Sequence, residues 1–180
     1  MTTIVSIDAE CNGLAGRAFC VAASWSNRET ELDLVVYRCP INGTPDPWVV
    51  DNVLPALVDV PQTHDTYEEM LDDLRAVIDT WGGKQTPMLG HVIWPVEARL
   101  LLDMYPAERI WRGPYPLLDV ASILHARGYE PTSVDSYLTT HGIPVPSGSP
   151  HHPLYDARAA ERCSRHLMPP PPLTQEGLTR

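Results

Sequence analysis

The chain has 180 residues, of which 43% are hydrophobic and 20% charged, which suffices for one well-buried core and falls short of two. Its formal net charge of −10 argues against a surface that grips long nucleic acid through a broad basic face. No apolar run reaches about 18 residues and no basic segment precedes the first apolar stretch, so we expect a cytoplasmic protein without a membrane span or signal peptide.

Three β-rich runs open the chain and predict an antiparallel meander. They lie at residues 3–8, 18–25 and 32–37. Two helices follow, a short one at 48–57 and a longer amphipathic one at 66–81. Thr66 and Glu69 form a capping-box pattern that predicts where the longer helix begins.

Helix and strand alternate in the rest of the chain. The predicted strands lie at 87–92 and 116–120, and the predicted helices at 95–104, 121–127, 133–141 and 153–167. This order predicts an α/β fold with a mixed five-stranded sheet flanked by helices. We expect a single domain over residues 1–168 and a Pro-rich, flexible tail over 169–180, because four consecutive prolines cannot continue a helix.

The first predicted strand ends with two carboxylates, Asp8 and Glu10, separated by one residue. Because side chains alternate faces along a strand, both point the same way, roughly 6 to 7 Å apart along the backbone. Taken alone, such a pair is typical of a solvated surface. Held in an interior, the two charges repel each other unless a proton or a cation sits between them.

Two histidines and an acid mark the start of the last predicted helix. Pro153 fits the first helical position, which places His152 near the N-cap and His151 just outside, on the loop. Asp156 then lies one turn inside the helix, where the helix N-terminus favours a carboxylate. The segment is therefore either a polar helix cap or a place where a carboxylate and a histidine meet the first two acids.

A third segment lies midway between these two. Glu97 falls in the first turn of the predicted helix at 95–104, after the strand end Gly90-His91. Taken alone, a helix glutamate at this position is typical of a solvated residue. Its interest comes from its place at a strand-to-helix junction between the other two motifs.

Together these segments resemble the DEDDh family of 3′-to-5′ exonucleases, which includes ribonuclease T, oligoribonuclease and proofreading exonucleases. The family's first motif, a strand ending in Asp-x-Glu, is matched by Asp8 and Glu10. Its third motif, a histidine followed by four residues and an aspartate, is matched by His151 and Asp156. The resemblance covers roughly residues 3–167 and implies a ribonuclease H-like fold.

The second motif departs from the family pattern. Val92 stands where the family has asparagine, and Glu97 stands where it has aspartate. Asp119 resembles an acid that the family often carries near the next strand end, and we interpret it as a supporting or structural residue.

The resemblance implies a mechanism with two Mg²⁺ or Mn²⁺ ions held by Asp8, Glu10, Asp156 and Glu97, with His151 as general base. Carboxylate oxygens suit these ions, and the scattered cysteines do not suit zinc. The resemblance implies cleavage from 3′ ends to 5′-mononucleotides, and the acidic balance and small size of the chain favour single-stranded substrates, RNA slightly over DNA. A homodimer is compatible with the resemblance.

Two alternatives stay open at this point. One is an endonuclease of the same fold, which cuts internally, and the other is a catalytically weak nucleic-acid-binding or proofreading-type accessory module. Several arginines are candidate phosphate contacts, with surface solvation as the alternative. They are Arg99, Arg109, Arg112, Arg158 and Arg162.

Overall fold

The computed structural model describes residues 3–27, 29–106 and 111–168, so the predicted tail at 169–180 lies outside the described residues. Five strands form one sheet in the order β3-β2-β1-β4-β5. They are β1 (Ile4–Cys11), β2 (Ala18–Ser26), β3 (Glu31–Arg38), β4 (Met88–Gly90) and β5 (Leu117–Asp119). The first three strands pair antiparallel, and β4 and β5 run parallel to β1, which confirms the predicted mixed sheet.

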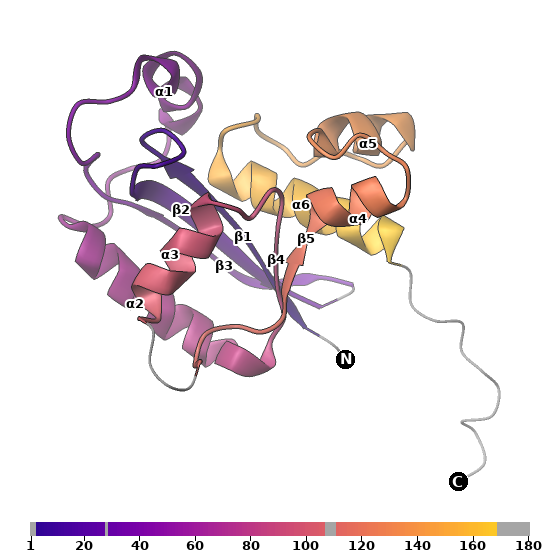
Figure 1. Cartoon of the computed structure of the whole chain (residues 1–180), viewed down its shortest axis with the longest axis horizontal. Helices are drawn as coiled ribbons and strands as arrows, with labels where there is room; N and C mark the ends of the chain where they lie inside the picture. The colour runs from indigo at the N-terminus through magenta and orange to yellow at the C-terminus, as the bar shows by residue number, and fades with distance from the viewer. Residues whose placement is uncertain (1–2, 28, 107–110, 169–180) are drawn as a thin grey trace, which may run out of the picture.

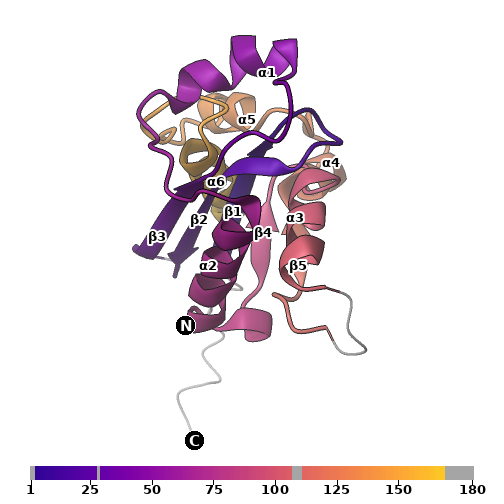
Figure 2. The ribbon, with the colours of Figure 1, turned by 90° about the vertical axis from the view of Figure 1, so that its left-hand side faces the viewer.

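Helices cover both faces of this sheet (Figure 1 and Figure 2). They are α1 (Pro47–Asn52), the 3-10 turn η1 (Leu54–Leu57), α2 (Tyr67–Thr80), the turn η2 (Gly83–Gln85), α3 (Val96–Met104), α4 (Val120–Ala126), α5 (Val134–Thr140) and α6 (Pro153–Leu167). Side chains of α2 and α3 pack with Val5 and Ile7 on one face of β1. Side chains of α4, α5 and α6 pack with Ile4 and Leu89 on the other. By alternation, Asp8 and Glu10 therefore face the α6 side.

Local sequence signals account for several element boundaries. The Glu69 amide donates to the Thr66 hydroxyl at 3.1 Å and the Thr66 amide donates to the Glu69 carboxylate at 3.1 Å, which confirms the capping box. The predicted helix at 48–57 is wrong as a single helix. Pro55 lacks an amide hydrogen and its ring crowds the preceding turn, so the chain forms the short α1 and then the separate turn η1.

Strand boundaries differ from the prediction where the site begins. β1 continues past Asp8 to Cys11, because β2 pairs with it as far as Ala18. β4 stops at Gly90, and Val92 takes a left-handed backbone conformation with φ of 56°. Asp8 and Glu10 therefore lie within a hydrogen-bonded strand, whereas the neighbouring strand β4 has already ended.

Two smaller expectations concern cysteines and membranes. All four cysteines are free and buried. None of the described helices is long and apolar enough to cross a membrane.

Candidate functional site

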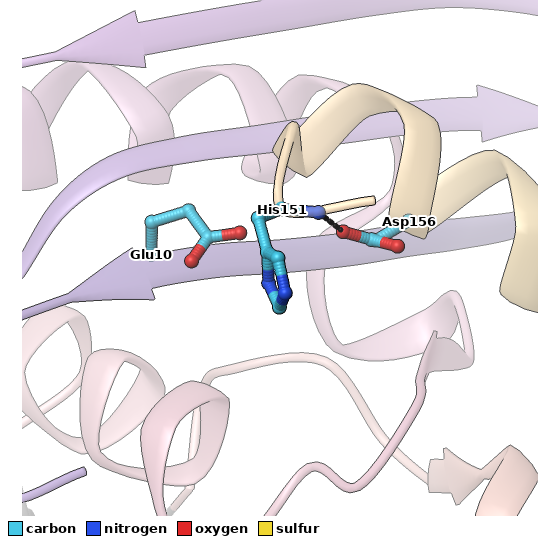
Figure 3. Close-up of side chains that lie close together, drawn as sticks. All are labelled: Glu10, His151 and Asp156. Carbon is cyan, nitrogen blue, oxygen red and sulfur yellow. Dashed lines mark hydrogen bonds between the residues drawn. The ribbon is translucent and has the colours of Figure 1, made fainter. Parts of the chain in front are cut away.

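Three side chains from distant parts of the chain come together at one end of the sheet. Glu10 lies on β1, His151 on the loop before α6, and Asp156 in the first turn of α6. One ligand atom of each lies within 4.8 Å of the others, a spacing at which the three side chains could share one metal ion. Figure 3 shows the carboxylates of Glu10 and Asp156 extending toward His151 from opposite sides.

The start of α6 fixes the third motif. His152 is the N-cap, and its Nδ1 accepts a hydrogen bond from the Leu154 amide at 3.2 Å. His151 lies just outside, with φ of 66°, an uncommon conformation for a residue other than glycine. In this conformation its backbone amide donates to Asp156 Oδ2 at 2.8 Å (Figure 3). The strained loop therefore orients the helix carboxylate.

Asp8 and Glu10 share the face of β1 that α6 covers. Burial raises the pKa of Asp8 well above its usual range, and the charges of Asp156, Glu97 and Glu10 raise it further. Burial also raises the pKa of Glu10 to about 8, again with help from Asp156 and Glu97. Asp8 and Glu10 therefore lie close to other carboxylates in a buried site.

The pKa values of the two acids that lie on helices, Asp156 and Glu97, are also raised. Burial raises the pKa of Asp156 to about 7, although the His151 amide acts in the opposite direction. Burial raises the pKa of Glu97 to about 7. A divalent cation placed among such carboxylates replaces their mutual repulsion with attraction, so this donor set fits Mg²⁺ or Mn²⁺.

Glu97 lies beside this cluster of acids but is held by a hydrogen bond to the strand itself. It is only 4% exposed, and its Oε1 accepts a hydrogen bond from the backbone amide of Ala9 at 3.1 Å. Ala9 sits between the two β1 carboxylates. Glu97 is therefore tied to the strand that carries them and is not among the residues that line the adjacent cleft.

Asp119 is a structural residue. Its carboxylate accepts from the amides of Ala121 and Ser122 at 3.2 and 3.3 Å and from the Ser122 hydroxyl at 2.7 Å, which caps α4. It also accepts from the Val92 amide at 2.9 Å. The same side chain thus starts a helix and holds the loop that follows β4.

A cleft of about 750 Å³ opens beside the acids. Asp8, Glu10, His151 and Asp156 line it together with residues of α1, α5 and the turn after β1. Its walls also include exposed apolar side chains. They are Leu14, Trp48 and Val92, with 72%, 55% and 47% of their surface exposed.

Sequence reasoning missed two residues of this cleft. The Trp48 ring stands edge-on to the His151 ring, with centroids 5.2 Å apart and an interplanar angle of 86°. Asp135, in the first turn of α5, raises the pKa of the neighbouring Asp156. In the sequence, Trp48 is one residue of a predicted helix and Asp135 an ordinary acid at a helix start, so only the tertiary arrangement identifies them.

Comparison with known proteins places this geometry in a fold. No protein-family model and no curated protein matches the sequence. The structure is similar to S. pombe Pop2p in its Mg²⁺- and Mn²⁺-bound form, with a TM-score of 0.65 and 13% identity over 90% of this chain and 82% of that one. It is also similar to exonuclease X in complex with 5′-overhanging duplex DNA, with a TM-score of 0.62 and 17% identity over 93% and 91% of the two chains.

A further similar structure is E. coli exonuclease I in complex with an oligonucleotide, with a TM-score of 0.62 and 15% identity. It covers 92% of this chain, which spans 41% of that one. The chain has a ribonuclease H-like fold. This confirms the predicted fold class, and two of these neighbours are exonucleases, the kind of enzyme that the sequence motifs resemble.

Proposed function

We propose that this chain is a metal-dependent 3′-to-5′ exonuclease that hydrolyses single-stranded nucleic acid, RNA slightly favoured over DNA, to 5′-mononucleotides. The observation that carries the proposal is the meeting of Glu10, His151 and Asp156 within 4.8 Å beside a cleft. The neighbours solved with Mg²⁺ and Mn²⁺, with an oligonucleotide and with DNA support it.

Each acid has a place in the proposed metal site. Asp8 and Glu10 on β1 and Asp156 on α6 would hold two divalent ions, and Glu97 would complete their surroundings from the edge of β1. Bound there, such ions supply Lewis acidity for both the attacking water and the leaving oxygen of the phosphodiester. The raised pKa values of Glu10 and Asp156 describe the same carboxylates before a cation neutralises them.

His151 is the proposed general base. Its loop position brings the ring to the cleft, where it can take the proton of the attacking water. Imidazole is the side chain best suited to that exchange near neutral pH. The Trp48 ring against its face limits the orientations that the His151 ring can adopt.

The test is a time course with single-stranded RNA and DNA carrying a label at either the 3′ or the 5′ end, in Mg²⁺ or Mn²⁺. We expect stepwise shortening from the 3′ end and release of 5′-mononucleotides. Asp8→Asn should abolish cleavage while preserving the circular-dichroism spectrum. Full activity of Asp8→Asn contradicts the mechanism.

Two further outcomes separate the alternatives. A circular single strand should stay intact, because an exonuclease needs an end, and its cleavage identifies an endonuclease of the same fold. Binding of metal and nucleic acid without release of mononucleotides identifies a non-catalytic module. The glutamate in place of the second-motif aspartate is the feature that makes this last outcome worth testing.

A further inference from the structure

The charged side chains that line the cleft are mainly acidic. Among the described residues that line the cleft there is no arginine or lysine. Its charged side chains are carboxylates, joined by the histidines His91 and His151. The carboxylates are Asp8, Glu10, Asp46, Asp135 and Asp156. A phosphate that enters this cleft is repelled by these carboxylates unless cations intervene.

Three of the arginines that are candidate phosphate contacts bind other groups of the protein in the described part of the structure. Arg158 pairs with both carboxylate oxygens of Glu31, at 2.8 and 2.7 Å. Arg99 donates to the carbonyl of Ala15, and Arg162 donates to the carbonyl of Pro144 at 2.7 Å. Arg109 lies outside the described residues. These three described guanidinium groups therefore stabilise the fold at positions that do not line the cleft.

The cleft offers apolar surface in place of positive charge. Leu14, Trp48 and Val92 are exposed along it, and its volume of about 750 Å³ falls in the range of small-molecule sites, roughly 300–1,000 Å³. Such a cleft suits the terminal nucleotides of a strand and offers the following phosphates no arginine or lysine among the described residues that line it. The chain's net charge of −10 works against those phosphates as well.

We propose that the divalent ions, in place of any arginine or lysine among the described residues, anchor phosphate at this site, so that its substrate is the 3′-terminal unit of a strand, bound with an affinity that strand length does not increase. This inference rests on the proposed function, since it takes the bound ligand to be a nucleic-acid end. It differs from binding through a basic groove, in which each additional phosphate contact adds affinity and salt dependence.

The experiment measures binding of single-stranded oligonucleotides, from a dinucleotide to about twenty residues, in Ca²⁺ at several NaCl concentrations. Gel analysis after each titration confirms that the strands remain intact. We expect dissociation constants that agree within about threefold across the series and a salt slope that does not grow with length. Chelation with EDTA should weaken binding of every strand more than about tenfold.

A charge-insertion variant is the matched control. Thr132 lines the cleft and is exposed, so Thr132→Lys places one cation on the cleft wall without substituting any of the cleft carboxylates. We expect this variant to bind longer strands more tightly than the dinucleotide and to steepen the salt slope by up to about 0.7. In the unmodified chain, affinity that rises steadily with length, or binding that survives EDTA, overturns the proposal.

Cleavage in Mg²⁺, measured on the same strands, separates this inference from the proposed function. Cleavage together with length-dependent affinity means that the function holds and the inference is wrong. Metal-dependent, length-independent binding without cleavage of any strand means that the inference holds and the proposed exonuclease activity is wrong.

Discussion

Two helix starts bring a carboxylate to β1, and the difference between them shows how the same local pattern gives different environments. Asp156 and Glu97 each lie in the first turn of a helix, and each accepts a hydrogen bond from a backbone amide. For Asp156 the amide belongs to the loop residue His151, which leaves the carboxylate on the cleft wall. For Glu97 it belongs to Ala9 of β1, which holds the carboxylate at the edge of the strand and off the cleft wall.

The partner amide thus decides what each acid can reach. An amide on a neighbouring loop orients a carboxylate toward open space, where ions and substrate arrive. An amide on the strand itself holds the carboxylate at the strand's edge, where it influences the same charges from a buried position. We therefore propose direct metal binding for Asp156 and a supporting place for Glu97, and the following predictions test that division.

Of the two helix acids, Asp156 should show the larger effect, on substitution with asparagine. Loss of one charge from the cluster that holds the ions should lower kcat by about a thousandfold, equivalent to about 4 kcal/mol of transition-state stabilisation. Steady-state cleavage of a labelled strand measures it. Asp73→Asn, which changes an exposed acid paired with His64, is the matched control and should leave kcat unchanged. Activity within about twofold of the unmodified chain removes Asp156 from the mechanism.

Glu97→Gln should have a smaller effect. The amide oxygen of glutamine can still accept from Ala9, so the fold stays intact, and only the buried charge is lost. We expect kcat to fall by about tenfold and the melting temperature to hold or rise. Equal losses of kcat for this variant and Asp156→Asn contradict the proposed difference between the two acids, because they place both in direct contact with the ions.

Trp48→Ala should reduce kcat by about fivefold, since an edge-on ring contact stabilises by about 1 kcal/mol and orients His151. Trp48→Phe keeps a ring and should recover most of the loss. An effect confined to KM, with kcat unchanged in both variants, assigns Trp48 to substrate binding alone.

The smallest effect concerns stability without metal. The folded protein raises the pKa of Glu10 from 4.5 to about 8, so it binds a proton more tightly than the unfolded chain does. This contribution to stability is present at low pH and is lost as pH rises from about 4.5 to about 8.

Glu10→Gln isolates that contribution, because the amide is neutral at every pH. Its melting temperature should equal that of the unmodified chain near about pH 5 and exceed it by about 2–4 °C at about pH 8, both without metal. Differential scanning fluorimetry in EDTA measures the difference. Added Mn²⁺ should reverse it by stabilising the unmodified chain, and a constant difference at all pH values argues against charge crowding.

Local sequence signals predicted those features that depend on neighbours along the chain. The alternation of Asp8 and Glu10 follows from strand geometry, and Pro153 places His152 at the N-cap and His151 outside it. The capping box of α2 follows from Thr66 in the same way. Each of these predictions needs only backbone geometry over a few residues.

Features that depend on packing between distant segments were beyond that reasoning. The contact of Trp48 with His151 joins residues a hundred positions apart, and the bond from Ala9 to Glu97 joins β1 to the start of α3. Nothing near Glu97 in the sequence indicates that its partner is a strand amide. Motifs could list the candidate residues, but the contacts that hold the carboxylates of Asp156 and Glu97 required the structure.

The bond from Ala9 to Glu97 has a consequence for measurement. β4 pairs with β1 only as far as Leu89 and ends at Gly90, so the Ala9 amide lies beyond its neighbour strand, and the side chain of Glu97 takes the place of the missing strand carbonyl. The hydrogen-exchange rate of this one amide therefore reports where the Glu97 carboxylate is. If the carboxylate stays with the strand, the amide remains protected, and if it leaves to meet an ion, the amide becomes free to exchange.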